Sequence, residues 1–247
     1  MKLAVAQIPA APANLPENVA WHLTAAKTAV EAGANLLVFP ELSLTGYSCN
    51  MAEAWKTSIE NPAFTPLQDF ASENGLILIG GAPLKAETGK PYIGSIIFGE
   101  EGPEVYRKYH LDPDEVPYFQ RGDAYKTFEI DTKRIGCAIC ADMQHESLAA
   151  ALKSLGSDIY ALSAFVTPRG YKKDAELLSG YARTYGMTVM LSNFSNENDD
   201  MQTAGKSAIW APGGELIIAA KGCEETVLVA EQTPSGWQSD ALPLQKP

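Results

Sequence analysis

The stretch "KRIGCAICADMQHES", Lys133 to Ser147, decides the fold. An apolar run carries two cysteines and ends at Cys140, where a polar turn leads into a helical pattern. A buried strand, a turn and a helix in this order are typical of an α/β domain. In open α/β sheets, ligands bind outside the carboxyl ends of the strands. The stretch therefore predicts an α/β fold and raises the question of what the Cys140 thiol does.

Several structural roles for Cys140 are disfavoured by its surroundings. Cys137 and Cys140 lie three residues apart in a strand pattern, so their side chains point to opposite faces and do not pair. A redox C-x-x-C motif begins a helix, whereas "CAIC" precedes the turn. Zinc needs about four ordered ligands, and the other cysteines and the histidines are scattered, so we expect no metal. We expect Cys137 to pack in the core. Cys140 lies before a helix N-terminus, which favours a thiolate.

The rest of the chain repeats the strand and helix patterns. Near-continuous apolar runs predict buried strands in "KLAVAQI", "NLLVFP", "LILIGGA", "IGSIIFG", "DIYALSAF", "TVMLSNF" and "SAIWAP". Helical spacing occurs in "PENVAWHLTAAKTAVEAGA", "ESLAAALKSLG" and "KKDAELLSGYARTYG". Turn residues predict hairpins in "EIDTKRIG" and "IWAPGGELII". With no linker, we expect one domain over residues 1–247, with mixed sheets, outer helices and an extended Pro-rich tail over about 233–247.

Composition narrows the class of protein. The chain has 247 residues, 46% of them hydrophobic, and a net charge of −11, which argues against binding to nucleic acid or anionic membranes. No run approaches the roughly 18 apolar residues of a membrane helix. "MKLAVAQIPA" is typical of a first strand and not of a signal peptide. Four cysteines in so long a chain predict no disulfide framework, so we expect a cytoplasmic enzyme or binding protein for a small molecule.

Polar side chains stand where the expected strands end. Glu41 ends "LLVFPE", Ser163 ends "YALS", Asn193 ends "VMLSN", and Cys140 ends its own strand. Together these endings predict a shared crevice. A lone carboxylate at an apolar strand end is costly unless it is paired or used. Lys108 in "VYRKYHL" closes another strand pattern, and its ammonium is suited to pair with Glu41 or to face a developing oxyanion.

The histidines offer another base for Cys140. His110 and His145 are both candidates under the general cysteine–histidine pattern. His22 lies in the middle of a helical pattern, so we expect it to be structural or exposed. From the residues alone, a set of glutamate, lysine and cysteine is favoured slightly over a cysteine–histidine pair.

The order of "FPELSLTGY", "YRKYHL" and "IGCAICAD" resembles the nitrilase superfamily of carbon–nitrogen hydrolases. "VAQIPA", "SGYARTYGMTVMLSN" and "GKSAIWAPGGELI" extend the resemblance over residues 1–230, approximately. It implies a four-layer α-β-β-α sandwich, no metal or organic cofactor, and a homodimer or higher homo-oligomer. It also implies that Glu41, Lys108 and Cys140 form the catalytic triad, and that Glu115 in "DPDEVPYFQRG" is the second glutamate of the family.

The resemblance also implies a reaction. Glu41 takes the proton of the Cys140 thiol, and the thiolate attacks the carbon of a small amide or N-carbamoyl substrate. Lys108 and the backbone N–H of Ala141 hold the oxyanion. Ammonia or an amine leaves, and water then hydrolyses the thioester. Glu115 orients Lys108 or the substrate; the alternative is a solvated loop acid in an acidic run.

The turn after the nucleophile departs from the family pattern. Ala141 stands in place of an aromatic residue, Gln144 in place of a basic residue and His145 in place of a proline. The smaller Ala141 is expected to open room in the pocket, and His145 is expected to face solvent. These departures leave the substrate open. The predicted substrate-binding residues, by their positions after strand ends or triad segments, are Tyr47, Tyr118, Ala141, Ala164 and Phe165.

Several functions use this set of residues. The first hypothesis is an amidase or carbamoyl hydrolase. Nitrile hydrolysis is an alternative, although nitrilases proper resemble longer chains and often have Trp-Glu after the cysteine, where this chain has Ala-Asp. Acyl transfer from the same thioester is another alternative. A further one, from a different class, is a catalytically weak binding or scaffold protein.

Overall fold

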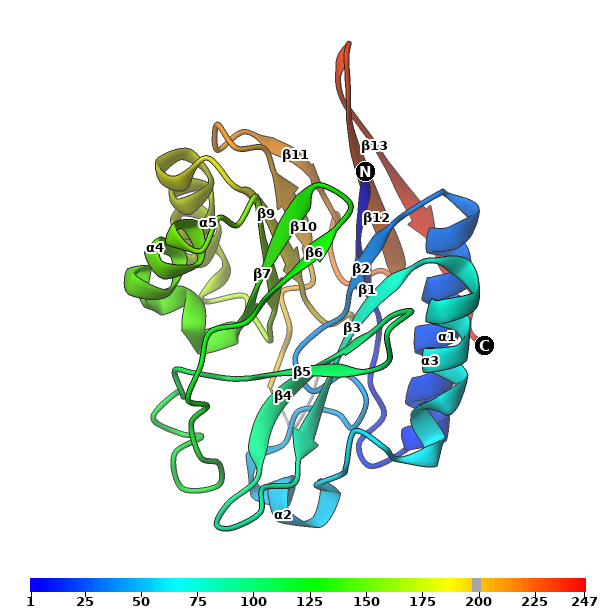
Figure 1. Ribbon diagram of the computed structural model, residues 1–247, viewed down its shortest axis with the longest axis vertical. Coiled ribbons are helices and arrows are strands. Elements are labelled where there is room, and N and C mark those ends of the chain that lie inside the picture. The colour runs from blue at the N-terminus through cyan, green and yellow to red at the C-terminus, as the bar shows by residue number, and fades with distance from the viewer. Residues whose placement is uncertain (197–200) are drawn as a thin grey trace.

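The protein, described here from a computed structural model for residues 1–196 and 201–247, is a four-layer sandwich. Two β-sheets pack face to face, and helices cover both outer sides (Figure 1). The predicted α-β-β-α architecture is thereby confirmed. The helices are α1 (Leu15–Glu31), α2 (Ala52–Trp55), α3 (Thr65–Asn74), α4 (Glu146–Ser154) and α5 (Tyr171–Tyr185). α1 and α3 cover one sheet, and α4 and α5 cover the other.

The first sheet has seven strands in the order β13-β12-β1-β2-β3-β4-β5. Its central strands β1, β2 and β3 are parallel, and the remaining neighbours pair antiparallel. The strands are β1 (Lys2–Gln7), β2 (Leu36–Val38), β3 (Ile77–Leu84), β4 (Tyr92–Phe98), β5 (Glu104–Arg107), β12 (Thr226–Thr233) and β13 (Gly236–Pro243).

The second sheet has six strands in the order β11-β10-β9-β8-β7-β6. Here β7, β8 and β9 are parallel, so each sheet is built around a parallel triplet. The hairpins expected from turn residues are present as β6–β7 and β10–β11. The strands are β6 (Thr127–Ile130), β7 (Lys133–Ile139), β8 (Ile159–Ser163), β9 (Thr188–Ser192), β10 (Ala208–Trp210) and β11 (Leu216–Ala219).

The C-terminal tail is more ordered than its proline content suggests. It is extended, as predicted, but β13 also pairs along its whole length with β12. β13 forms the edge of the first sheet, and its hairpin with β12 projects from the body of the molecule (Figure 1). The sequence pattern missed this strand because polar and apolar residues do not alternate regularly in it.

Apolar side chains from both sheets fill the space between them. Val5, Ile79 and Met190 belong to this inner core, and each is at most 2% exposed. Hydrogen bonds also join the sheets: the Ser192 hydroxyl donates to the Ala6 carbonyl at 2.6 Å. Burial of this apolar surface is the main favourable term in folding, and it fixes how the strand ends of the two sheets face each other.

The strand directions bring the expected site residues to one edge. Because β5 is antiparallel to β4, and β4 is antiparallel to β3, β5 runs the same way as β2 and β3. The segments after β2 and β5, which carry Glu41 and Lys108, therefore leave the first sheet at the same edge. Cys140 directly follows β7, which belongs to the facing sheet.

Gly81 in β3 fits closely against the turn that follows Glu41. A Cβ atom at Gly81 would lie 2.3 Å from the backbone nitrogen of Leu42, which is an impossible contact. We predict that Gly81→Ala lowers the free energy of unfolding by roughly 1–3 kcal/mol, since overpacking forces the backbone to shift. Urea denaturation monitored by circular dichroism measures the change.

Gly180 supplies the matched control for this substitution. It lies inside α5, and a Cβ atom there would meet nothing within 4 Å. Gly180→Ala is therefore expected to raise the free energy of unfolding by about 0.5–1 kcal/mol, because alanine favours the helix. Equal effects of the two substitutions on the free energy of unfolding would show that the turn after Glu41 does not require a glycine at position 81.

Candidate active site

Glu41 is held in a buried turn after β2. Leu42 follows it with a φ of 53°, a left-handed conformation that non-glycine residues seldom adopt. The Ser43 hydroxyl supports this turn: it accepts from the Gly81 N–H at 3.3 Å and contacts His22 Nε2 at 2.9 Å. Burial lowers the pKa of His22 to about 4, so its ring is neutral and structural.

Lys108 lies between two carboxylates in the interior. Its Nζ is 2.7 Å from Glu41 Oε1 and 2.7 Å from Glu115 Oε1, and all three side chains are fully buried. The predicted pairing of Lys108 with Glu41 is present. Ion pairs of this kind are maintained only when geometry compensates for the loss of hydration. The arrangement therefore fixes the position of the ammonium group.

Glu115 is part of this buried set and not a solvated loop acid. Its Oε1 also accepts from the Tyr47 hydroxyl at 3.1 Å, and its Oε2 accepts from the Asp112 backbone N–H at 2.8 Å. The loop after β5 thus folds back so that its glutamate points inward. Glu115 is hydrogen-bonded to Lys108, the residue that it is expected to orient.

The charges in this set are unequal, with one ammonium facing two carboxyl groups. Burial raises the pKa of Glu41 to about 7; the Lys108 charge opposes the rise and the Glu115 charge adds to it. Burial alone would lower the pKa of Lys108, but Glu41 and Glu115 together raise it above its usual value. Lys108 is therefore charged at neutral pH, while Glu41 is poised to exchange a proton.

Cys140 begins a 3₁₀ turn over Cys140–Gln144 and is not the last residue of the strand, which ends at Ile139. Its φ of 39° is strained for a residue with a side chain. The thiol is half-buried and donates to the Phe165 carbonyl at 3.7 Å. Burial first, and then the Glu41 charge, raise its pKa well above the usual value. The resting group is therefore a thiol, and it needs a base.

Glu41 is placed to be that base. Within residues 1–196 and 201–247, nothing donates a hydrogen bond to its buried Oε2 atom, while Oε1 is held by Lys108. The Cys140 thiol is among the groups that shift the pKa of Glu41. One oxygen of the carboxyl group is thus fixed, and the other is available for a proton.

Asp142 holds the turn that carries Cys140. Its fully buried carboxylate accepts from the Tyr106 hydroxyl at 2.6 Å, from the Ile139 backbone N–H at 3.0 Å and from the His110 backbone N–H at 2.8 Å. The aspartate connects the nucleophile turn to the segment just after Lys108. The sequence did not assign this role, since two of the three donors, Tyr106 and His110, lie far from Asp142 in the chain.

Two of the residues that depart from the family pattern, Gln144 and His145, contact other side chains. The Gln144 amide donates to Asp174 on α5 at 2.8 Å. His145 is exposed, as expected, and its ring stacks on His110 at 3.8 Å between centroids. Among the described residues, no hydrogen bond joins His110 or His145 to the Cys140 thiol. The alternative cysteine–histidine pair therefore has no support in the geometry.

The predicted substrate-binding residues do not all lie at the site. Tyr47 and Phe165 stack at 5.3 Å beside the carboxylates and the thiol, and Ala141 follows the nucleophile directly. Ala164 packs in the core beneath α4 and α5, and the Tyr118 ring is 40% exposed on the loop. Cys49, which the sequence did not single out, donates to the Tyr47 hydroxyl at 3.8 Å.

Two features that are typical of other classes of protein are absent from the described residues. No group of three or more His, Cys, Asp or Glu side chains is arranged to hold a metal ion. None of the helices in this part of the chain is long and apolar enough to cross a bilayer.

Comparison with known proteins places the chain in a family. The family model of the carbon-nitrogen hydrolases matches residues 2–241, so the chain belongs to that family and is a carbon-nitrogen hydrolase of the nitrilase superfamily. A curated relative, omega-amidase NIT2 of Xenopus tropicalis, is 29% identical over 219 residues, covering 83% of this chain and 79% of the relative. A nitrilase of Pyrococcus abyssi is 29% identical over 212 residues, with 83% and 79% covered.

Solved structures agree with the fold. An E41L mutant of the amidase of Nesterenkonia sp. AN1 superposes with a TM-score of 0.84 at 22% identity, covering 98% of this chain and 90% of that one. Saccharomyces cerevisiae Nit3 superposes with a TM-score of 0.85 at 23% identity, covering 96% and 91%. The four-layer sandwich is thus shared with other members of the superfamily.

The pKa of Glu41 predicts how activity depends on pH. A base accepts a proton only while it is ionised, so kcat/KM on a neutral amide should fall as the pH drops through about 7. A pH profile of initial rates, measured with an uncharged substrate, locates this acidic limb. A limb near the ordinary glutamate pKa of about 4.3 would contradict the assignment of Glu41 as a buried base.

Proposed function

We propose that the protein hydrolyses the C–N bond of a small amide or N-carbamoyl compound through a thioester on Cys140. The observation that carries the proposal is the Lys108 ammonium, fixed at 2.7 Å from both Glu41 and Glu115 in a fully buried set. A preorganised cation beside a thiol and a free carboxylate oxygen stabilises negative charge that develops on a carbonyl oxygen.

The first half of the reaction forms the thioester. Glu41 Oε2 takes the proton from the Cys140 sulfur as the sulfur attacks the carbonyl carbon. The oxyanion faces Lys108 Nζ and the backbone N–H of Ala141. The C–N bond then breaks, and the nitrogen leaves as ammonia or an amine, carrying the proton that Glu41 held.

The second half releases the acid. Glu41 accepts a proton from a water molecule, whose oxygen attacks the thioester carbon while Lys108 again faces the oxyanion. The C–S bond breaks, the sulfur regains a proton from Glu41, and a carboxylic acid leaves. Glu115 does not exchange protons in this scheme, because its oxygens are engaged by Lys108, Tyr47 and the backbone of Asp112.

The substrate class rests on the walls of the site and on the relatives. The stacked rings of Tyr47 and Phe165 form a compact aromatic wall next to the triad. Several curated relatives are named omega-amidases, including the Xenopus tropicalis and Homo sapiens proteins, which favours amides over nitriles. In the Nesterenkonia amidase, the acetamide moiety of fluoroacetamide adds to the active-site cysteine. We assign the corresponding role to Cys140 on the geometry of this chain.

A homodimer and a cytoplasmic location remain predictions.

The direct test of the proposal is ammonia release from a panel of small ω-amides, N-carbamoyl amino acids and nitriles. We expect release from the amide or carbamoyl members, and a loss of at least about a thousandfold in Cys140→Ala, since no nucleophile remains. Lys108→Ala is expected to lose turnover as well. Because it leaves two carboxylates buried, its folded fraction must be measured in parallel.

Cys137→Ser is the matched control. Cys137 is 2% exposed in the inner core, and burial raises the pKa of its thiol to about 12, so it is no nucleophile. Turnover should stay within about tenfold of the unmodified protein, because a packed thiol acts mainly through stability. Full activity in Cys140→Ala, or complete loss in a folded Cys137→Ser protein, would refute the mechanism.

A further inference from the structure

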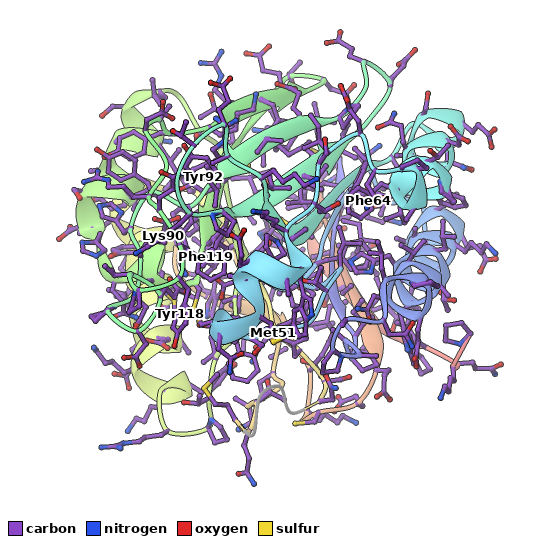
Figure 2. The ribbon with its side chains drawn as sticks, turned by 90° about the horizontal axis from the view of Figure 1, so that it is seen from below. Met51, Phe64, Lys90, Tyr92, Tyr118 and Phe119 are labelled. Carbon is purple, nitrogen blue, oxygen red and sulfur yellow. The ribbon has the colours of Figure 1, made fainter. Side chains whose placement is uncertain are left out.

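A pocket lies beside the loop that carries Glu115 and apart from the triad residues. It has a volume of about 620 Å³, and none of Glu41, Lys108 and Cys140 lines it. It is bounded by the turn before β4, by the loop over residues 109–121 and by the start of α4. Figure 2 shows two of its lining residues, Lys90 and Phe119, on the side of the molecule away from α1 and α3. We call it the loop pocket.

The charge of the loop pocket is opposite to that of the chain. Lys90, Arg121, His110 and His145 line it, and among residues 1–196 and 201–247 no Asp or Glu does, although the net charge of the protein is −11. The exposed Arg121 guanidinium makes no salt bridge within the described part of the chain and lies over the Tyr109 ring at 4.4 Å. Two cations without a facing carboxylate attract an anion.

Apart from Gly89 and Gln120, the remaining lining residues have mainly apolar side chains. They are Tyr109, Leu111, Val116 and Phe119, and Val116 is 52% exposed. A ligand that suits these walls has an apolar body as well as a charged group. The volume lies within the roughly 300–1,000 Å³ typical of small-molecule pockets, which favours a small ligand over a macromolecule.

The loop pocket is connected to the catalytic groups through its walls. His110 is bound to Asp142, which holds the nucleophile turn, with the imidazole Nδ1 at 3.2 Å from the carboxylate. Val116 directly follows Glu115, and its carbonyl accepts from the Lys90 ammonium at 2.7 Å. A ligand in this pocket therefore touches residues adjacent to Lys108, Glu115 and the Cys140 turn.

We propose that the loop pocket binds a small organic carboxylate with an aromatic or aliphatic body, at a site separate from the triad. Arg121 and Lys90 bind the carboxylate group, and the imidazole rings and the apolar walls contact the body of the ligand. Arginine suits the first role because its planar fork matches a carboxylate.

Phenylacetate is the probe, and histidine NMR is the readout. The chain has three histidines, of which His110 and His145 line the pocket while His22 is 1% exposed elsewhere. In Cys140→Ala protein labelled at the histidine ring carbons, phenylacetate should shift the His110 and His145 signals saturably at fixed pH and leave His22 unchanged. Benzyl alcohol, which lacks the charge, should shift them far less.

Arg121→Ala and Arg107→Ala form a matched pair of variants. Both arginines are exposed and lie over a tyrosine ring, but only Arg121 lines the pocket. We expect about tenfold weaker phenylacetate binding in Arg121→Ala and unchanged binding in Arg107→Ala, since charge-assisted hydrogen bonds contribute on this scale. Three results would overturn the proposal. They are equal phenylacetate binding in both variants, equal histidine shifts with benzyl alcohol and with phenylacetate, and histidine shifts that depend on the protein concentration but not on the phenylacetate concentration.

Discussion

The ammonium group of Lys108, enclosed by two carboxyl groups, is the interaction on which the site depends. A charge this deep is unstable without partners, so the turn after β2 and the loop after β5 must both deliver a glutamate to it. Because the set holds one cation and two acids, one acid retains a proton easily, and Glu41 is the one whose second oxygen is unengaged. The position of the two glutamates and the proton exchange of Glu41 thus both follow from the burial of one ammonium group.

The architecture meets this constraint by pairing two parallel triplets. The first sheet brings Glu41 and Lys108 to one edge, and the facing sheet places Cys140 there. The two turns are strained: Leu42 and Cys140 both have positive φ values. Such conformations persist because their surroundings fix them, here the close approach of Gly81 to one turn and the Asp142 hydrogen bonds to the other.

The sequence predicted the fold and the pairing of Lys108 with Glu41 because both depend on local signals. Buried parallel strands are near-continuous apolar runs, and a polar residue at the end of each is conspicuous. The roles of Asp142 and Tyr47 escaped prediction because their partners are distant in the chain and a hydrogen bond leaves no periodic pattern. Tyr118 and Ala164 were predicted from position alone, which does not determine burial: Tyr118 is exposed, and Ala164 packs in the core.

The proposed covalent bond between substrate and Cys140 is directly observable by mass spectrometry. Trypsin should release Ile135–Lys153, a peptide that contains both Cys137 and Cys140. After an acid quench during turnover of a small amide, fragment ions of this peptide separate the two thiols. We predict an added acyl mass on Cys140 alone. An acyl group on Cys137 or on any other residue, with Cys140 unmodified, would contradict the account.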